Sequence, residues 1–268
     1  MMNMRRSKVL SKLRRGEISL CAKLNLKDAS VAEIACLCGF DCIWLDMEHV
    51  PNDWSTIENQ INRAKVYDVD TVVRVSKGSY SDYIKPLEID SSGIMVPHMI
   101  SLKEAKELVW KTRFHPIGRR PADGGNADGA YCMMNFKEYI EAANKERFVI
   151  VQIEDPEALG EIDEIAKLDG IDMLFFGPGD FSQGIGKPGN LDAPEIDTAR
   201  IKVAEIARKN NKFAGTVGNA ETVDRLINVG YQFINVAADV IGLSTYFKGI
   251  YASINKKNNL ISNSIYSK

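Results

Sequence analysis

The sequence predicts an α/β chain folded as one (β/α)8 barrel. Short, continuously apolar runs alternate with amphipathic stretches about eight times in about 250 residues. Strands that are apolar throughout are typical of a parallel sheet buried on both faces. The alternative is an open doubly wound sheet, which usually has fewer strands and a glycine fingerprint after the first strand. No such fingerprint follows the first strand here, so the barrel is favoured.

Each predicted strand is a short apolar run, and an amphipathic stretch follows it. The strands are ISLCAKL (18–24), DCIWLDM (41–47), DTVVRV (70–75), GIMVP (93–97), FVIVQI (148–153), IDMLFF (171–176), KFAGTV (212–217) and QFINVA (232–237). Helices are expected at 30–38, 54–65, 81–88, 102–112, 136–145, 194–209, 220–228 and 240–254, with one more between the fifth and sixth strands. Residues 114–133 and the Gly/Pro-rich stretch 177–190 are expected to be irregular loops.

Composition indicates a globular protein with one domain over residues 1–255 and a polar tail over 256–268. Hydrophobic residues make up 45% of the 268 residues, enough for a sizeable core. The net charge of −2 gives no overall positive electrostatic potential that would attract nucleic acid. The basic start, MMNMRRSKVLSKLRRGE, lacks the apolar region of a secretory signal and predicts an amphipathic surface helix. The sequence contains no run of 18 apolar residues, so no membrane-spanning helix is predicted.

The five cysteines are odd in number, and four lie in apolar segments, which argues against a disulfide framework. We therefore expect a reducing, cytoplasmic location. Cys36, Cys38 and Cys42 are close in sequence but lack the spacing of a zinc site, so they are interpreted as buried hydrophobic residues.

Polar residues gather where the predicted strands end, which is the functional face of a (β/α)8 barrel. They are Lys23, Asp46, Glu48, His49, Arg74, His98, Gln152, Glu154 and Asp180, with the backbone of residues 177–180. Glu154 and Asp180 follow successive strands, and two carboxylates there suit Mg²⁺ or Mn²⁺. Alternatively, Glu154 caps the next helix and Asp180 fixes a turn.

Arg74 and His49 are the candidates for chemistry at these ends. A charge on the apolar strand DTVVRV is costly unless it meets an anion. The guanidinium of Arg74 is therefore expected to bind a carboxylate or a ketone oxygen, or else to pair internally with Asp46 or Glu48. His49 is the candidate acid or base, although a lone histidine is often structural. A metal, an arginine and a base together suit enolate chemistry on a 2-oxo acid.

Five ordered motifs resemble the HpcH/HpaI aldolase/citrate lyase family, in one register from about residue 15 to 250. They are WLDMEHVPND (44–53), VVRV (72–75), GIMVP (93–97), VQIED (151–155) and GPGDFS (177–182). The resemblance implies a barrel of the phosphoenolpyruvate/pyruvate-domain type and a class II pyruvate aldolase. It further implies a divalent cation (Mg²⁺, Mn²⁺ or Co²⁺), a 2-oxo acid and an aldehyde as substrates, and a hexamer built as a trimer of dimers that exchange the last helix.

The resemblance also assigns roles by position. Glu154 and Asp180 match the metal ligands, Arg74 and Gln152 match residues at the pyruvyl oxygen, and Gly177, Pro178 and Gly179 match the segment that holds the carboxylate. His49 matches the base, and Asp46 matches an acid near the metal. Glu88 stands where the family has an aspartate that reaches this histidine from a neighbouring subunit, and Arg120 matches an arginine of the loop after the fourth helix.

The chain departs from the family at two places. Lys23 stands where an aromatic residue is frequent, and it favours an anionic aldehyde if it faces the site rather than the solvent at the rim. The loop GRRPADGGNADGAY (118–131) instead resembles the branch that contains macrophomate synthase, an oxaloacetate decarboxylase.

Three hypotheses follow for the function. The first is reversible aldol cleavage of a 4-hydroxy-2-oxo acid, of the 2,4-dihydroxyhept-2-ene-1,7-dioate or 2-dehydro-3-deoxyglucarate type, to pyruvate and an aldehyde. The second is oxaloacetate decarboxylation at the same site. The third is a non-catalytic barrel that serves as a binding subunit.

Overall fold

Eight parallel strands pair in chain order, and the last strand pairs with the first to close a barrel. The computed structural model describes residues 3–265, with side chains described as far as residue 256. The strands are β1 (Ser19–Leu24), β2 (Cys42–Asp46), β3 (Asp70–Arg74), β4 (Gly93–Val96), β5 (Phe148–Ile153), β6 (Met173–Phe176), β7 (Phe213–Val217) and β8 (Phe233–Ala238). The predicted (β/α)8 barrel is confirmed, and the open-sheet alternative is wrong.

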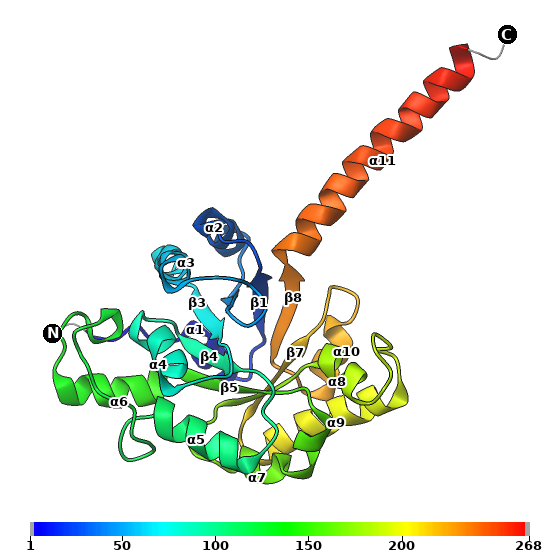
Figure 1. Cartoon of the computed structure of the whole chain (residues 1–268). Coiled ribbons are helices and arrows are strands. Elements are labelled where there is room, and N and C mark those ends of the chain that lie inside the picture. The colour runs from blue at the N-terminus through cyan, green and yellow to red at the C-terminus, as the bar shows by residue number, and fades with distance from the viewer. Residues whose placement is uncertain (1–2, 266–268) are drawn as a thin grey trace.

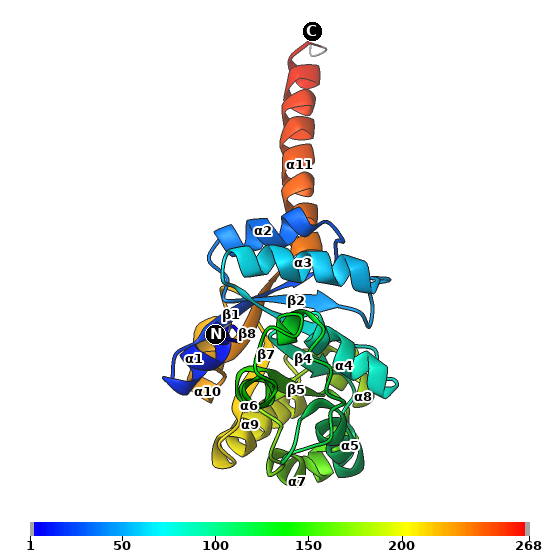
Figure 2. The same ribbon diagram turned by 90° about the vertical axis from the view of Figure 1, so that its left-hand side faces the viewer.

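Helices surround the barrel, and one long helix projects away from it (Figures 1 and 2). They are α1 (Lys8–Arg14), α2 (Ala29–Leu37), α3 (Trp54–Val66), α4 (Tyr80–Glu88), α5 (Leu102–Thr112), η1 (Ala127–Gly129), α6 (Phe136–Glu146), η2 (Pro156–Gly160), α7 (Ile162–Ala166), α8 (Pro178–Gly184), α9 (Pro194–Lys209), α10 (Val223–Val229) and α11 (Asp239–Ile265). Apart from η1, no helix interrupts residues 114–133, as the sequence predicts.

Side chains that point into the barrel form stacked layers. Alternate residues of each strand face inward, and in an eight-stranded barrel each layer takes its members from alternate strands. The strand registers place Lys23, Arg74, Gln152 and Val217 in the layer near the carboxyl ends, and Trp44, Met95, Phe175 and Asn235 in the layer beneath. Trp44 and Phe175 pack edge to face with centroids 5.5 Å apart, so an aromatic floor lies under the polar upper layer.

Helix α1 closes the amino-terminal end of the barrel. Val9, Leu10 and Leu13 are buried and pack with the side chains of the barrel interior. Asp70, at the start of β3, accepts hydrogen bonds from Ser7 Oγ (2.5 Å) and Val9 N (2.9 Å). The predicted helix is confirmed, but its predicted surface position is wrong because its apolar face fills the open end of the barrel.

Two further predictions about elements are wrong. Residues 178–184 form α8 rather than a loop, because Pro178 fits the first helical turn and Phe181 and Ser182 are buried. Helix α11 runs to Ile265 instead of ending near 254. Its asparagine-rich end contains neither proline nor glycine to stop it, so the expected tail is helical as far as 265, and 266–268 lie outside the described residues.

The cysteine interpretation holds in part. Cys21, Cys36 and Cys42 are buried free thiols, whereas Cys38 is exposed at the C-cap of α2, so its predicted burial is wrong. Within residues 3–265, no helix combines the length and apolar character needed to cross a membrane.

Candidate active site

Asp46 is the centre of the first charged cluster at the carboxyl ends of the strands. Its carboxylate accepts two hydrogen bonds from Arg74, at Nε (3.0 Å) and Nη2 (2.6 Å). Lys23 Nζ lies 2.8 Å from Asp46 Oδ2, and Arg74 Nη1 lies 3.0 Å from Glu48 Oε2. Both cations also lie over the ring of Trp44, at 5.4 Å for Lys23 and 4.9 Å for Arg74.

These contacts fix the charge state and the orientation of the cluster. Burial alone would raise the pKa of Asp46, but hydrogen bonds and charge from Arg74, then from Lys23, lower it to about 2. Arg74 therefore has the internal partners that the sequence left open as an alternative. The ion pairs also hold its guanidinium rigidly in the upper inward-facing layer, where a ligand at the mouth would meet it.

His98 and Glu154 are the centre of the second cluster. His98 has a left-handed backbone, with φ of 50°, and its N–H donates to Glu154 Oε1 at 2.9 Å. Its ring Nδ1 lies 3.0 Å from Asp155 Oδ2, and its Nε2 lies 3.6 Å from Glu48 Oε1. Glu48 thus links the two clusters, and a continuous chain of polar contacts runs from β1 to β5.

Glu154 is a buried carboxylate in an acidic environment. Burial is the main cause that raises its pKa to about 7, and the charges of Asp180 and Glu48 add to the effect. The side-chain amide of Gln152 donates a hydrogen bond from Nε2 to Glu154 Oε2. The hydrogen bonds of Glu154 run to His98 and Gln152 rather than to the helix that follows, which argues against the capping interpretation.

The residues present fit a divalent cation. A buried carboxylate that is destabilised by a neighbouring carboxylate gains from a cation between the two, and Mg²⁺ is often held by one or two carboxylates. Within the described residues, no group of three or more His, Cys, Asp or Glu side chains has metal-site geometry. Glu154 and Asp180 would hold the ion.

Helix α8 places the segment Gly177–Asp180 beside Glu154. A Cβ atom at Gly177 would lie 2.6 Å from Glu154 Oε2, so only glycine allows this approach. Pro178 is buried in the first helical turn, with Gly179 exposed and Asp180 partly exposed after it. Gly177 therefore packs directly against the second cluster at the start of this segment.

His49 lies at the edge of the site. Its side chain is 57% exposed, and its Nε2 lies 3.5 Å from Glu48 Oε2. The structure thus brings it to the strand-end clusters, where its ring remains accessible to a ligand at the mouth.

Glu88 and Arg120 are not brought to the strand-end clusters. Arg120 is buried, with Nη2 at 2.7 Å from Asp128 Oδ2 and its guanidinium over the ring of Phe114. Burial raises the pKa of Glu88, and the charged groups that act on it are Arg120, Asp128, Asp123 and Lys85. Both residues belong to the surroundings of loop 118–131 in their own chain.

Sequence reasoning missed one polar residue that faces the interior. Asn235 lies on β8 and is 7% exposed, and its Oδ1 has no hydrogen-bond partner among the described residues. The one available signal was an asparagine inside the apolar strand QFINVA, which was interpreted only as part of the strand.

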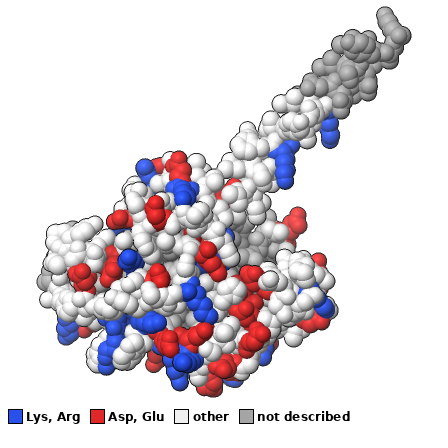
Figure 3. Space-filling view, in the orientation of Figure 1, with Lys and Arg blue, Asp and Glu red and all other residues white. Residues whose placement is uncertain are grey.

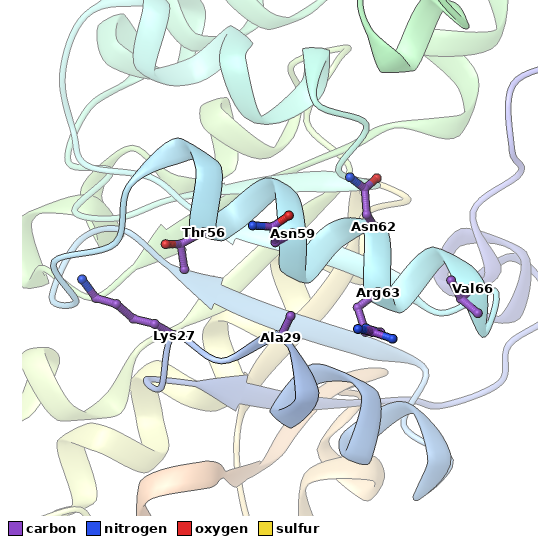
Figure 4. A pocket seen from close by; sticks show the side chains of 7 residues that line it. All are labelled: Lys27, Ala29, Thr56, Asn59, Asn62, Arg63 and Val66. Carbon is purple, nitrogen blue, oxygen red and sulfur yellow. The ribbon is translucent and has the colours of Figure 1, made fainter.

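A separate groove lies outside the barrel between α2 and α3 (Figure 4). It has a volume of about 450 Å³ and is lined by Lys27, Ala29, Thr56, Asn59, Asn62, Arg63 and Val66. It contains no carboxylate and none of the predicted site residues, so the chemistry is placed at the strand ends.

A parallel barrel whose carboxyl end gathers an anchored arginine and buried carboxylates has the architecture of a (β/α)8 enzyme, whose functional groups lie at this end. Residues 23–244 match the HpcH/HpaI aldolase/citrate lyase family, and the chain belongs to this family. The predicted resemblance is confirmed.

Curated relatives and solved structures agree with this assignment. The chain is 32% identical to a hydroxypyruvate/pyruvate aldolase of Pseudomonas aeruginosa, over 85% of each chain. It is 30% identical to a 2-keto-3-deoxy-L-rhamnonate aldolase of Klebsiella pneumoniae, over 85% of this chain and 86% of that protein. An HpcH/HpaI aldolase from Desulfitobacterium hafniense superposes with a TM-score of 0.87 at 26% identity, covering 91% of this chain and 95% of the other. Macrophomate synthase shares the fold, with a TM-score of 0.84 at 24% identity over 97% of this chain and 91% of its own.

Proposed function

We propose that the protein is a metal-dependent aldolase that reversibly cleaves a 4-hydroxy-2-oxo acid to pyruvate and an aldehyde. One observation carries this proposal: the guanidinium of Arg74 and the buried carboxylate of Glu154 lie at the same barrel end, joined through Glu48 and His98. Both groups suit an enolate oxygen, because one donates hydrogen bonds and the other would hold a cation. The aldolase names of its relatives point to the same reaction class.

The bond changes follow from this placement. His49, which is accessible at the edge, takes the proton of the C4 hydroxyl, and the C3–C4 bond breaks as the aldehyde carbonyl forms. The electron pair of that bond becomes the enolate of pyruvate, whose oxygen receives hydrogen bonds from Arg74. A divalent cation held by Glu154 and Asp180 would neutralise negative charge on the 2-oxo and carboxylate oxygens. A proton then returns to C3 to give the methyl group of pyruvate.

Proton exchange of pyruvate is the first test, because it needs no knowledge of the aldehyde. We expect the methyl signal of pyruvate to disappear in heavy water when Mg²⁺ or Mn²⁺ is present, as followed by NMR. A chelator should stop the exchange. Exchange that continues unchanged in excess chelator, or no exchange with any of Mg²⁺, Mn²⁺ and Co²⁺, would contradict the proposal.

His49→Ala tests the role of the proposed base while leaving the residues of the proposed enolate site unchanged. We expect aldol cleavage to fall by a factor of about 10²–10⁴, the range for loss of a general base. His115→Ala is the matched control, because His115 is an exposed histidine outside the strand-end clusters. Equal losses in the two variants would show that His49 has no special role.

We also propose that the active protein is a homo-oligomer in which a second copy covers α11. The helix leaves the barrel at Asp239, and as far as residue 256 its surface is largely uncharged (Figure 3). Its exposed apolar side chains are Val240, Ile241, Leu243, Tyr246, Phe247, Ile250, Tyr251 and Ile254. Such a surface is typical of an interface between subunits.

This assembly would supply Glu88 to the site from another subunit. Within its own chain, the charged groups that act on Glu88 include Arg120 and Asp128. We expect light scattering to show a hexamer, and the double substitution Tyr246→Glu with Ile250→Glu to give smaller species with much reduced activity. A monomer that is fully active would contradict this.

The free thiols Cys21, Cys36 and Cys42 support a reducing, cytoplasmic location.

A further inference from the structure

His98 has a backbone conformation that residues with a side chain rarely adopt. It lies between β4 and α5, directly after Pro97, and its φ of 50° is in the left-handed region. The Cβ atom of an L-amino acid disfavours this region, although Asn, Asp and His enter it more often than other residues. Such a conformation persists where the surrounding structure imposes it, and residues of this kind cluster at functional sites. The proposed bond changes assign no task to His98.

Contacts on the carbonyl side and on the ring hold His98 in this conformation. Its carbonyl oxygen accepts a hydrogen bond from Lys77 Nζ at 2.6 Å. The ring Nδ1 lies 3.0 Å from Asp155 Oδ2, and the ring Nε2 lies 3.6 Å from Glu48 Oε1. The side chain is 39% exposed, so these contacts rather than close packing determine where the ring lies. Together they fix the left-handed turn in one orientation.

This turn directs the backbone N–H of His98 at the proposed metal ligand. The N–H donates to Glu154 Oε1 at 2.9 Å, and the side-chain amide of Gln152 donates to Glu154 Oε2. Each oxygen of this buried carboxylate therefore has one donor, and lone pairs remain on both oxygens for a cation. A carboxylate that is held in this way does not need to reorient when the cation binds, which favours binding.

We propose that His98 is a positioning residue for the divalent cation. Its ring contacts and Lys77 keep the backbone left-handed, and the backbone N–H fixes Glu154 in the orientation that binds the ion. The imidazole acts through the backbone, since the nearest partners of its two nitrogens are Asp155 and Glu48. The inference rests on the proposed aldolase function and adds a residue to its metal site.

Binding of Mn²⁺ to the metal-free protein tests this role without any measurement of activity. Electron paramagnetic resonance measures free Mn²⁺ during a titration, which gives a dissociation constant for each variant. His98→Ala removes the ring contacts but keeps the Cβ atom that disfavours the left-handed backbone, so the N–H turns away from Glu154. We expect the affinity to fall by about 10–100-fold, the range for loss of a group that orients a metal ligand.

His98→Gly and His98→Asn separate the backbone from the ring. Glycine enters the left-handed region about as readily as the right-handed one, and asparagine tolerates it better than most residues. We expect His98→Asn to bind Mn²⁺ within a few-fold of wild type, His98→Gly to bind it more weakly, and His98→Ala to bind it most weakly. If the imidazole itself binds the ion, the glycine and asparagine variants bind no better than alanine. That result would overturn the proposal.

Asn211→Ala is the matched control for a change at a left-handed residue. Asn211 has a φ of 55°, but it is exposed and follows the C-cap of α9, outside the strand-end clusters. Its substitution should leave the dissociation constant of Mn²⁺ unchanged. Circular dichroism checks that each variant is folded. If His98→Ala does not fold, binding by His98→Asn decides, because only the backbone role keeps its affinity close to that of wild type.

The outcomes distinguish failure of the positioning role from failure of the aldolase proposal. If wild-type protein binds Mn²⁺ and exchanges the methyl protons of pyruvate, but all three His98 variants bind Mn²⁺ as wild type does, the positioning role is wrong and the enolate function stands. If wild-type protein binds no Mn²⁺, the positioning role and the metal-dependent function are both wrong.

Discussion

The two ends of the barrel use the same residue types for opposite purposes. At the amino-terminal end, Arg147 pairs with Asp90, and Arg5 pairs with Asp70, so buried charges meet opposite charges. At the carboxyl-terminal end, carboxylates outnumber lysine and arginine, and Glu154 is left in an acidic environment. In a barrel of this type, the first end provides stability and the second end provides function. Matched substitutions at the two ends test this division.

Arg74→Ala should have the largest effect. Removing the guanidinium takes away the donors proposed for the enolate oxygen, and loss of such a group costs roughly 10²–10³ in rate. We expect pyruvate exchange to fall by about 10³-fold with fold retained, because Lys23 still pairs with Asp46. Rates from NMR, together with a circular dichroism spectrum, check this. Activity within tenfold of wild type would remove Arg74 from the mechanism.

Arg147→Ala is the counterpart at the other end. It leaves Asp90 buried with fewer partners, and breaking a buried ion pair costs about 3–5 kcal/mol. Denaturant unfolding should show this loss, whereas exchange per folded molecule should stay near that of wild type. Arg147→Lys serves if the alanine variant does not fold. Loss of activity without loss of stability would break the comparison.

The pKa of Glu154 makes the carboxyl end sensitive to pH. The folded protein raises this pKa from 4.5 to about 7, so the unfolded chain releases its proton first as pH rises. The stability of metal-free protein should therefore fall between pH 4.5 and 7, by up to about 3 kcal/mol, and level off above that. Thermal unfolding at several pH values measures this.

Mg²⁺ should reverse the pH effect, because it binds the deprotonated carboxylate. Its stabilisation of the protein should grow as pH rises from 5 to 8. Glu154→Gln should remove both the pH-dependent loss and the response to Mg²⁺. If Glu154→Gln still loses stability as pH rises, the loss comes from another titratable group.

The smallest effect is expected at the exposed margin of the amino-terminal end. Lys8 pairs with Asp68, with side chains 48% and 57% exposed. Exposed pairs contribute about 0–1 kcal/mol, so Lys8→Ala should change the unfolding free energy by less than about 1 kcal/mol. A loss as large as that of Arg147→Ala would show that exposure does not govern these pairs.

The sequence was sufficient for the barrel and for most strand-end residues. Runs such as FVIVQI are apolar in both alternating positions, which fixes a buried parallel strand. Polar residues that end such runs, among them Arg74 and Glu154, must then lie at one edge. The local sequence pattern alone therefore predicts both the buried strands and the edge of the sheet where their polar ends lie.

Features that depend on distant contacts could not be predicted in this way. The amphipathic pattern of α1 shows an apolar face but not that the barrel interior receives it. The resemblance matches Arg120 to an arginine of the loop after the fourth helix, but the sequence does not show that the fold of loop 118–131 brings Asp128 to it. The register between β1 and β8 decides that Asn235 lies below Lys23, and no periodicity within either strand contains that information.

The position of α1 also limits the routes by which ligands can enter and leave the barrel. The side-chain layers of the interior, with Val9, Leu10 and Leu13 beneath them, leave ligands no passage along the barrel axis. Molecules that enter at the mouth must leave by the same route, so the one that enters first is the last to depart. Under the proposed aldolase function, an aldehyde bound nearer the mouth than pyruvate would delay the release of pyruvate. Ordered addition and release in steady-state kinetics would be the signature of this architecture.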